Sequence, residues 1–123
     1  MTPSPHTIPP HASMAKAHEV MREHGIRHLP VVLAGRLLGT VSQRDLAIME
    51  SLPGVDPKEV PVEDAMSADV YTASPDAPLR FVVTEMASRK IGSAVIMDGE
   101  TVIGVFTTID ALHALSQVLS AMA

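Results

Sequence analysis

Two short stretches of the chain place a glycine, a hydroxyl group and a carboxylate at the same spacing. They are Gly39-Thr-Val-Ser-Gln-Arg-Asp45 and Gly104-Val-Phe-Thr-Thr-Ile-Asp110. The glycine lets another group approach the backbone closely. The Ser or Thr three residues later can cap a helix, whose free N–H groups and dipole favour a phosphate. The aspartate can accept hydrogen bonds from both hydroxyls of a ribose. The spacing therefore predicts a nucleotide site, although a plain capping box explains the same Ser/Thr–Asp pairs without a ligand.

These two stretches are parts of an internal repeat. A shift of 65 residues aligns residues 1–50 with 66–115 without a gap, so that the two glycines coincide and the two aspartates coincide. A repeat of this length indicates that one structural unit is used twice. The segment 53–61 contains three prolines and a glycine, a composition typical of a connector. We therefore expect one repeat at residues 1–52, a linker at 53–60 and a second repeat at 61–123.

Hydrophobic periodicity and turn residues predict the order β-α-β-β-α in both repeats. In the second repeat the expected elements are an extended piece at 69–73, a helix capped by Asp76 and ending near Lys90, strands at 93–97 and 101–106 around the hairpin signal Asp98-Gly99, and a helix opened by Thr107. In the first repeat they are an extended piece at 7–8, a helix at 13–24 closed by Gly25, strands at 28–33 and 36–41 around Ala34-Gly35, and a helix at 42–51. One repeat buries too little surface alone, so we expect an α+β fold in which two β-α-β-β-α repeats pack about a pseudo-twofold axis.

With these elements in place, the two motifs and the stretch Ile26-Arg-His-Leu-Pro-Val-Val32 make the chain resemble a tandem pair of cystathionine-β-synthase (CBS) domains, also called a Bateman module. Both motifs fit the pattern G-h-h-T/S-x-x-D, in which h is apolar and Thr40 is the marginal position. The resemblance implies a regulatory module that binds AMP, ADP or ATP, or in some members S-adenosylmethionine, in clefts between the repeats. It also implies a homodimer that passes ligand occupancy to an effector protein or domain.

The resemblance further implies which residues line each cleft, because members combine the motif of one repeat with the first strand of the other. The first cleft is expected to contain Thr40, Ser42 and Asp45, with Ala68, Val70 and Ile91, and with Arg27 and His28 at the phosphates. The second cleft is expected to contain Val105, Thr107 and Asp110, with Pro3, Pro5 and Ile26.

The two clefts are not expected to be equivalent. Arg27 and His28 are adjacent at the entry of a strand, so alternation points them to opposite faces unless that entry is irregular. The matching residues of the second repeat are Gly92 and Ser93, which carry no charge. We therefore rank the Asp45 cleft above the other as a phosphate site. A solvated surface Arg and His is the alternative interpretation of the basic pair.

Two further interpretations remain open from the sequence. The chain can be a structural dimerisation module with empty clefts, which shares every packing feature with a nucleotide sensor. The predicted short helix at 60–65, which leads into the second repeat, has no counterpart before Met1. If that lead-in is absent, the cleft around Asp110 lacks part of its wall.

Composition excludes several classes of protein. The net charge is −5 and aromatic residues are 2%, which argues against binding to nucleic acid. There is no cysteine, and no pair among the six histidines has the H-E-x-x-H spacing, so no disulfide and no metal site are expected. No G-x-S-x-G elbow supports a hydrolase, so we expect no enzyme activity and no required cofactor. The absence of a long apolar run or signal-like segment predicts a soluble, cytoplasmic protein without a membrane partner.

Overall fold

The computed structural model describes residues 2–3 and 6–123, with side chains from residue 6 onward. The chain divides into two compact units, one formed by Pro5–Val70 and the other by Tyr71–Ala123 together with the strand β1 (Thr2–Pro3). The expected linker boundaries at residues 53 and 60 stay a prediction.

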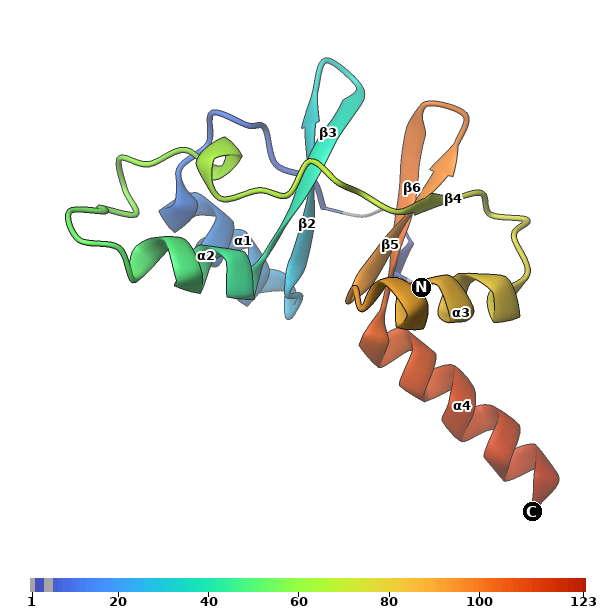
Figure 1. Cartoon of the computed structure of the whole chain (residues 1–123). Coiled ribbons are helices and arrows are strands. Elements are labelled where there is room, and N and C mark those ends of the chain that lie inside the picture. Colours follow the sequence, from blue (N-terminus) through green and yellow to red (C-terminus); the bar gives the residue numbers. More distant parts are fainter. Residues whose placement is uncertain (1, 4–5) are drawn as a thin grey trace. The chain divides into compact units, whose positions relative to one another are not determined.

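The first unit contains two helices and a hairpin (Figure 1). Its elements are α1 (Met14–His24), β2 (His28–Leu33), β3 (Arg36–Ser42), α2 (Gln43–Glu50) and a 3-10 turn at Val62–Asp64. The strands pair antiparallel, with His28 opposite Ser42. Ile8 extends this pairing as a parallel bridge to Val31, and Ser67 extends it on the other edge as an antiparallel bridge to Thr40.

The second unit repeats this arrangement around a four-stranded sheet in the order β1-β6-β5-β4. Its remaining elements are β4 (Thr72–Ala73), α3 (Leu79–Arg89), β5 (Ser93–Asp98), β6 (Thr101–Thr107) and α4 (Thr108–Met122). The pair Thr2–Val105 corresponds to Ser67–Thr40 after the 65-residue shift. The predicted β-α-β-β-α order is therefore confirmed in both repeats, and the short segment ahead of each repeat lies on the sheet of the other.

Each unit has its own apolar core. The α1 face predicted from periodicity, Met14, Ala17 and Met21, is buried in the first core together with β2, β3 and Leu46 of α2. Val82 and Met86 of α3 occupy the second core. Burial of each large side chain contributes about 1.5–3 kcal/mol, so these faces hold the helices on their sheets.

His18 is half-buried on α1, as its core-facing position predicted. Its Nε2 atom lies 2.9 and 3.0 Å from the two carboxylate oxygens of Glu50 at the end of α2. The equivalent residue in the second repeat is Val83, which packs at the edge of the second core. An ion pair or hydrogen bond thus joins the helices in one unit where an apolar contact serves in the other.

Two local predictions are wrong. Asp76 does not cap α3, because the helix begins at Leu79 and has Pro78 as its N-cap without a side-chain hydrogen bond. A proline disfavours helical geometry in the residue before it, so the helix cannot extend back to Asp76. The second hairpin turn is Gly99-Glu100 rather than Asp98-Gly99, since Asp98 pairs with Thr101 and Gly99 takes the left-handed φ of 62°.

Candidate functional site

The carboxylate of Asp45 is fixed at the start of α2 by a reciprocal capping box. The backbone N–H of Ser42 donates to Oδ2 of Asp45 at 2.8 Å, and the backbone N–H of Asp45 donates to Oγ of Ser42 at 3.0 Å. The motif therefore builds the capping box that the alternative interpretation required. Among the residues that the structure describes, no hydrogen bond reaches Oδ1 of Asp45. One carboxylate oxygen holds the helix, and the other is available to a ligand.

The N–H groups of the α2 terminus are less available than the sequence suggested. The N–H of Gln43 donates to the carbonyl of Arg27 at 2.9 Å. The N–H of Asp45 is taken by Ser42. Because these first-turn donors are already bonded, the helix terminus alone supplies little to a phosphate, and cationic side chains must supply the rest.

Arg27 and His28 provide such side chains immediately before and at the start of β2. Arg27 is exposed, whereas His28 is half-buried. Burial lowers the pKa of His28 from its usual 6.5, the Asp45 carboxylate acts in the opposite direction, and the Arg27 charge lowers it further. Both charges are therefore close enough to act on the imidazole. Near neutral pH the permanent positive charge of this cluster is Arg27, and His28 becomes charged only in more acidic solution or beside an anion.

The glycine of the first motif is required by the chain itself. A Cβ atom on Gly39 would lie 2.4 Å from the carbonyl oxygen of Ser67. That close approach lets Thr40 and Ser67 exchange backbone hydrogen bonds of 3.0 and 2.8 Å. Ala68 and Val70 follow directly along this segment. The expectation that glycine admits a close neighbour is confirmed, and the neighbour is the chain's own backbone.

Seven of the expected residues of the first site consequently belong to one compact unit. They are Arg27, His28, Thr40, Ser42, Asp45, Ala68 and Val70. Ile91 belongs to the other unit, so its assignment stays a prediction. Ser67 was not among the expected residues. The 65-residue shift aligns it with Thr2 and could have identified it, because that position pairs with the motif strand in both repeats.

The second motif forms the same capping box with a different surrounding. The N–H of Thr107 donates to Oδ2 of Asp110 at 2.8 Å, and the N–H of Asp110 donates to Oγ1 of Thr107 at 3.3 Å. The carbonyl of Gly92 accepts hydrogen bonds from the N–H and the Oγ1 of Thr108 at 3.1 and 3.2 Å. Gly92 and Ser93 therefore occupy the place of the basic pair without supplying charge.

The remaining expected residues of the second site are distributed differently. Val105 pairs with Thr2, and Pro3 pairs with Gly104, within the second unit. Ile26 belongs to the first unit, and Pro5 lies outside the described residues. Their role in a ligand site stays a prediction.

The sequence pattern of the CBS domain matches residues 1–49 and 62–117. The chain belongs to the CBS domain family. The two matched segments contain both capping motifs and both hairpins, so the chain is a tandem CBS pair.

Relatives of this CBS pair include small proteins and segments of larger ones. It is 29% identical to the CBS domain-containing protein YhcV of Bacillus subtilis over 105 residues, which are 85% of this chain and 74% of YhcV. It is also 32% identical to the inosine-5′-monophosphate dehydrogenase of Korarchaeum cryptofilum over 108 residues, which are 87% of this chain and 21% of that enzyme.

Solved structures share the fold along almost the whole chain. AcuB from Vibrio cholerae superposes with a TM-score of 0.86 and 31% identity, covering 99% of this chain and 90% of that one. The CBS domain pair of protein MJ0100 superposes with a TM-score of 0.80 and 26% identity, covering 94% and 92% of the two chains. The MJ0100 structure is a complex with 5′-methylthioadenosine and S-adenosylmethionine, so a CBS pair of this fold binds adenosine derivatives.

Residues 2–3 and 6–123 offer neither a metal cluster nor a membrane-spanning helix. No group of three or more potential ligand side chains is placed to hold a metal ion in this part of the chain. No helix in the same residues has the length and apolar character needed to cross a bilayer.

Proposed function

We propose that this CBS pair is a non-catalytic regulatory module that binds an adenosine phosphate, AMP, ADP or ATP, around Asp45. The observation that carries the proposal is the placement, within one compact unit, of a carboxylate with one oxygen unused and a basic pair close enough for charge interaction. A ribose hydroxyl donates to Oδ1 of Asp45. Ser42 donates its hydroxyl hydrogen to the phosphate, since its oxygen already accepts from the helix.

The phosphate end of this site takes its charge from Arg27 and His28. Charge-assisted hydrogen bonds are about twice as strong as neutral ones, so this pair favours a phosphorylated ligand over adenosine. Thr40, Ala68 and Val70 supply the wall beside the motif, and the CBS resemblance adds Ile91. The site around Asp110 lacks the basic pair and is proposed to take Thr107, Val105 and Ile26 around an adenosine derivative with little or no phosphate charge.

The second motif favours a second candidate ligand. S-adenosylmethionine and 5′-methylthioadenosine carry no phosphate, and both occur with the MJ0100 pair. Because Gly92 and Ser93 offer no charge for a phosphate, such ligands suit the site around Asp110 better than AMP does. The effector that responds to either ligand is a separate protein or domain.

AMP binding is expected to strengthen as the solution is acidified. In the free protein the pKa of His28 is lowered from 6.5 by burial, so the ring is neutral above that pH. A bound phosphate favours the charged ring and raises its pKa, so binding takes up a proton and affinity falls as pH rises through this range. Isothermal titration at pH 5.5 and 7.5 should show affinity about fivefold higher in acid for the wild type than for His28→Asn.

The phosphate of AMP also titrates near pH 6, but this change is common to both proteins and cancels in their ratio. Equal pH profiles of the wild type and His28→Asn would remove His28 from the site. Absence of AMP binding at either pH would refute the proposed function and favour a dimerisation module.

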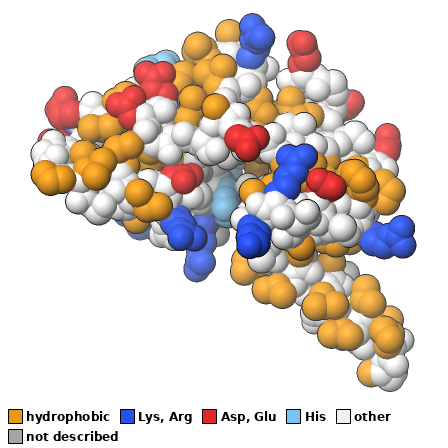
Figure 2. Space-filling model, viewed as in Figure 1, with side chains coloured by type: hydrophobic (Ala, Val, Ile, Leu, Met, Phe, Trp, Pro, Cys, Tyr) orange, Lys and Arg blue, Asp and Glu red, His pale blue; other side chains and the backbone are white. Residues whose placement is uncertain are grey.

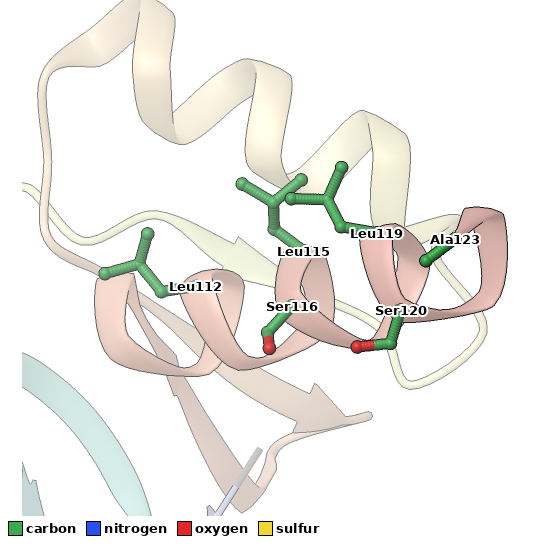
Figure 3. A pocket seen from close by; sticks show the side chains of 6 residues that line it. All are labelled: Leu112, Leu115, Ser116, Leu119, Ser120 and Ala123. Carbon is green, nitrogen blue, oxygen red and sulfur yellow. The ribbon is translucent and has the colours of Figure 1, made fainter.

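We also propose a homodimer, which the apolar face of α4 supports. Among residues 6–123, no side chain of α4 is buried, and Leu112, Leu115 and Leu119 are each more than half exposed. Figure 2 shows apolar side chains along this helix, and Figure 3 shows the three leucines on one side of a shallow groove beside Ser116 and Ser120. Residues 111–123 contain no Asp, Glu, Lys or Arg, so the same surface on a second copy meets no charge repulsion.

Leu115→Glu is therefore expected to convert the dimer to a monomer at micromolar concentration, because it places a charge in the middle of the apolar face. Gln117→Glu adds the same charge outside the leucine stripe and is expected to leave the dimer intact. Light scattering coupled to gel filtration measures both. A monomeric wild type, or a dimeric Leu115→Glu variant, would contradict the assignment of this surface.

A further inference from the structure

Each compact unit contains one stacking contact between the segment ahead of its sheet and the end of its first helix. In the first unit the rings of His6 and His24 lie 3.5 Å apart, with 13° between their planes. In the second unit Cζ of Arg89 lies 4.8 Å from the centre of the Tyr71 ring. The 65-residue shift places His6 on Tyr71 and His24 on Arg89. The repeats thus share a stacked pair at one position although its chemistry differs.

In the first unit the stacked pair joins the α1 terminus to the sheet. His6 is two residues before Ile8, whose N–H donates to Pro30 and whose carbonyl accepts from Val32, both at 3.0 Å. His24 is the last residue of α1, and only two residues separate it from Arg27. The stack therefore fixes the start of the short loop that leads to the basic pair.

The other end of that loop is fixed at α2. The carbonyl of Arg27 accepts the hydrogen bond from the N–H of Gln43 at 2.9 Å. The second unit has the same two anchors, since the carbonyl of Tyr71 accepts from Val95 at 2.9 Å and that of Gly92 from Thr108 at 3.1 Å. In both repeats, the loop after the first helix is held between a stacked pair and the capped helix that follows the motif.

We propose that the His6–His24 stack positions Arg27 and His28 for the phosphate of the ligand, and so sets how strongly the site prefers AMP to adenosine. The Tyr71–Arg89 pair holds the equivalent loop in the second unit, where Gly92 and Ser93 carry no charge. This inference rests on the proposed function of the Asp45 site. His6 and His24 are positioning residues, because they act through the basic pair.

His24→Ala tests this role through ligand preference. The ratio of AMP affinity to adenosine affinity is expected to fall about two- to tenfold, the range for loss of one ring pair, while adenosine affinity stays unchanged. The double variant His6→Tyr/His24→Arg installs the pair of the second unit and is expected to retain the ratio. Arg89→Ala is the matched control, and it should leave the ratio as it is.

A purely structural role of the stack predicts a different pattern. It would lower the affinity for AMP and adenosine equally, without rescue by the double variant. An unchanged ratio in His24→Ala, or an equal fall in Arg89→Ala, would overturn the inference.

Amide hydrogen exchange tests the same inference without a ligand. His24→Ala is expected to speed exchange of the Gln43 amide and leave that of Thr108 unchanged, whereas Arg89→Ala should do the reverse. If the wild type bound no adenine ligand, the proposed function would fail, and these exchange rates would still decide whether the stacks hold their loops. Unchanged exchange at Gln43 in His24→Ala would overturn that holding role.

Discussion

Asp45→Ala is expected to weaken adenosine-phosphate binding about ten- to a hundredfold. The carboxylate is the acceptor proposed for the ribose, and a hydrogen bond to a charged group contributes about 1.5–3 kcal/mol. The same substitution removes the acceptor of the Ser42 N–H, now bonded at 2.8 Å, and is expected to lower the free energy of unfolding by about 1 kcal/mol. Isothermal titration measures the first effect and urea denaturation the second.

Asp110→Ala is the matched control for this variant. It removes the equivalent acceptor, which takes the Thr107 N–H at 2.8 Å, so its loss of stability should be similar. Its effect on AMP affinity should be smaller, because Gly92 and Ser93 supply no charge to that site. Equal losses of AMP affinity in the two variants would contradict the ranking of the sites.

Gly39→Ala is expected to destabilise the first unit by about 3 kcal/mol. Its Cβ would lie 2.4 Å from the carbonyl oxygen of Ser67, so the two backbone segments must separate. Overpacking of this kind costs about 1–3 kcal/mol, and each lost hydrogen bond between Thr40 and Ser67 adds about 1 kcal/mol. Because Ala68 and Val70 follow Ser67, AMP affinity should fall as well.

Gly54→Ala provides a control in the same unit. Gly54 has a φ of +79°, and a Cβ atom on it would meet no neighbour within 4 Å, so the substitution adds backbone strain of about 1 kcal/mol without a clash. Urea denaturation followed by circular dichroism compares the two variants. If Gly39→Ala were no less stable than Gly54→Ala, the close approach would not be the reason for glycine in the motif.

The elements of the fold were largely predictable because their signals are local. Ser13 and Gly25 bound α1, and Ala34-Gly35 forms the turn between β2 and β3, as their types indicate. The start of α3 was not predicted correctly, since Pro78 overrides the capping preference of Asp76. The repeat itself carried the fold class, because a gapless shift requires equivalent hydrogen bonds in both halves.

The candidate site was predictable only in part. The capping boxes follow from the spacing of Ser42 with Asp45 and of Thr107 with Asp110. The occupation of the Gln43 N–H by Arg27 was not predictable, because it depends on where the loop after α1 passes the helix terminus. The lowered pKa of His28 likewise depends on burial, which no local pattern specifies.

Titration of the isotope-labelled protein with AMP, followed by amide NMR, tests the central claim most directly. The account predicts that the largest chemical-shift changes occur at residues 27–28, 40–45 and 67–70, and that Asp45→Ala abolishes them at the same AMP concentration. Changes confined to residues 92–93 and 105–110, or no change at any AMP concentration, would contradict it.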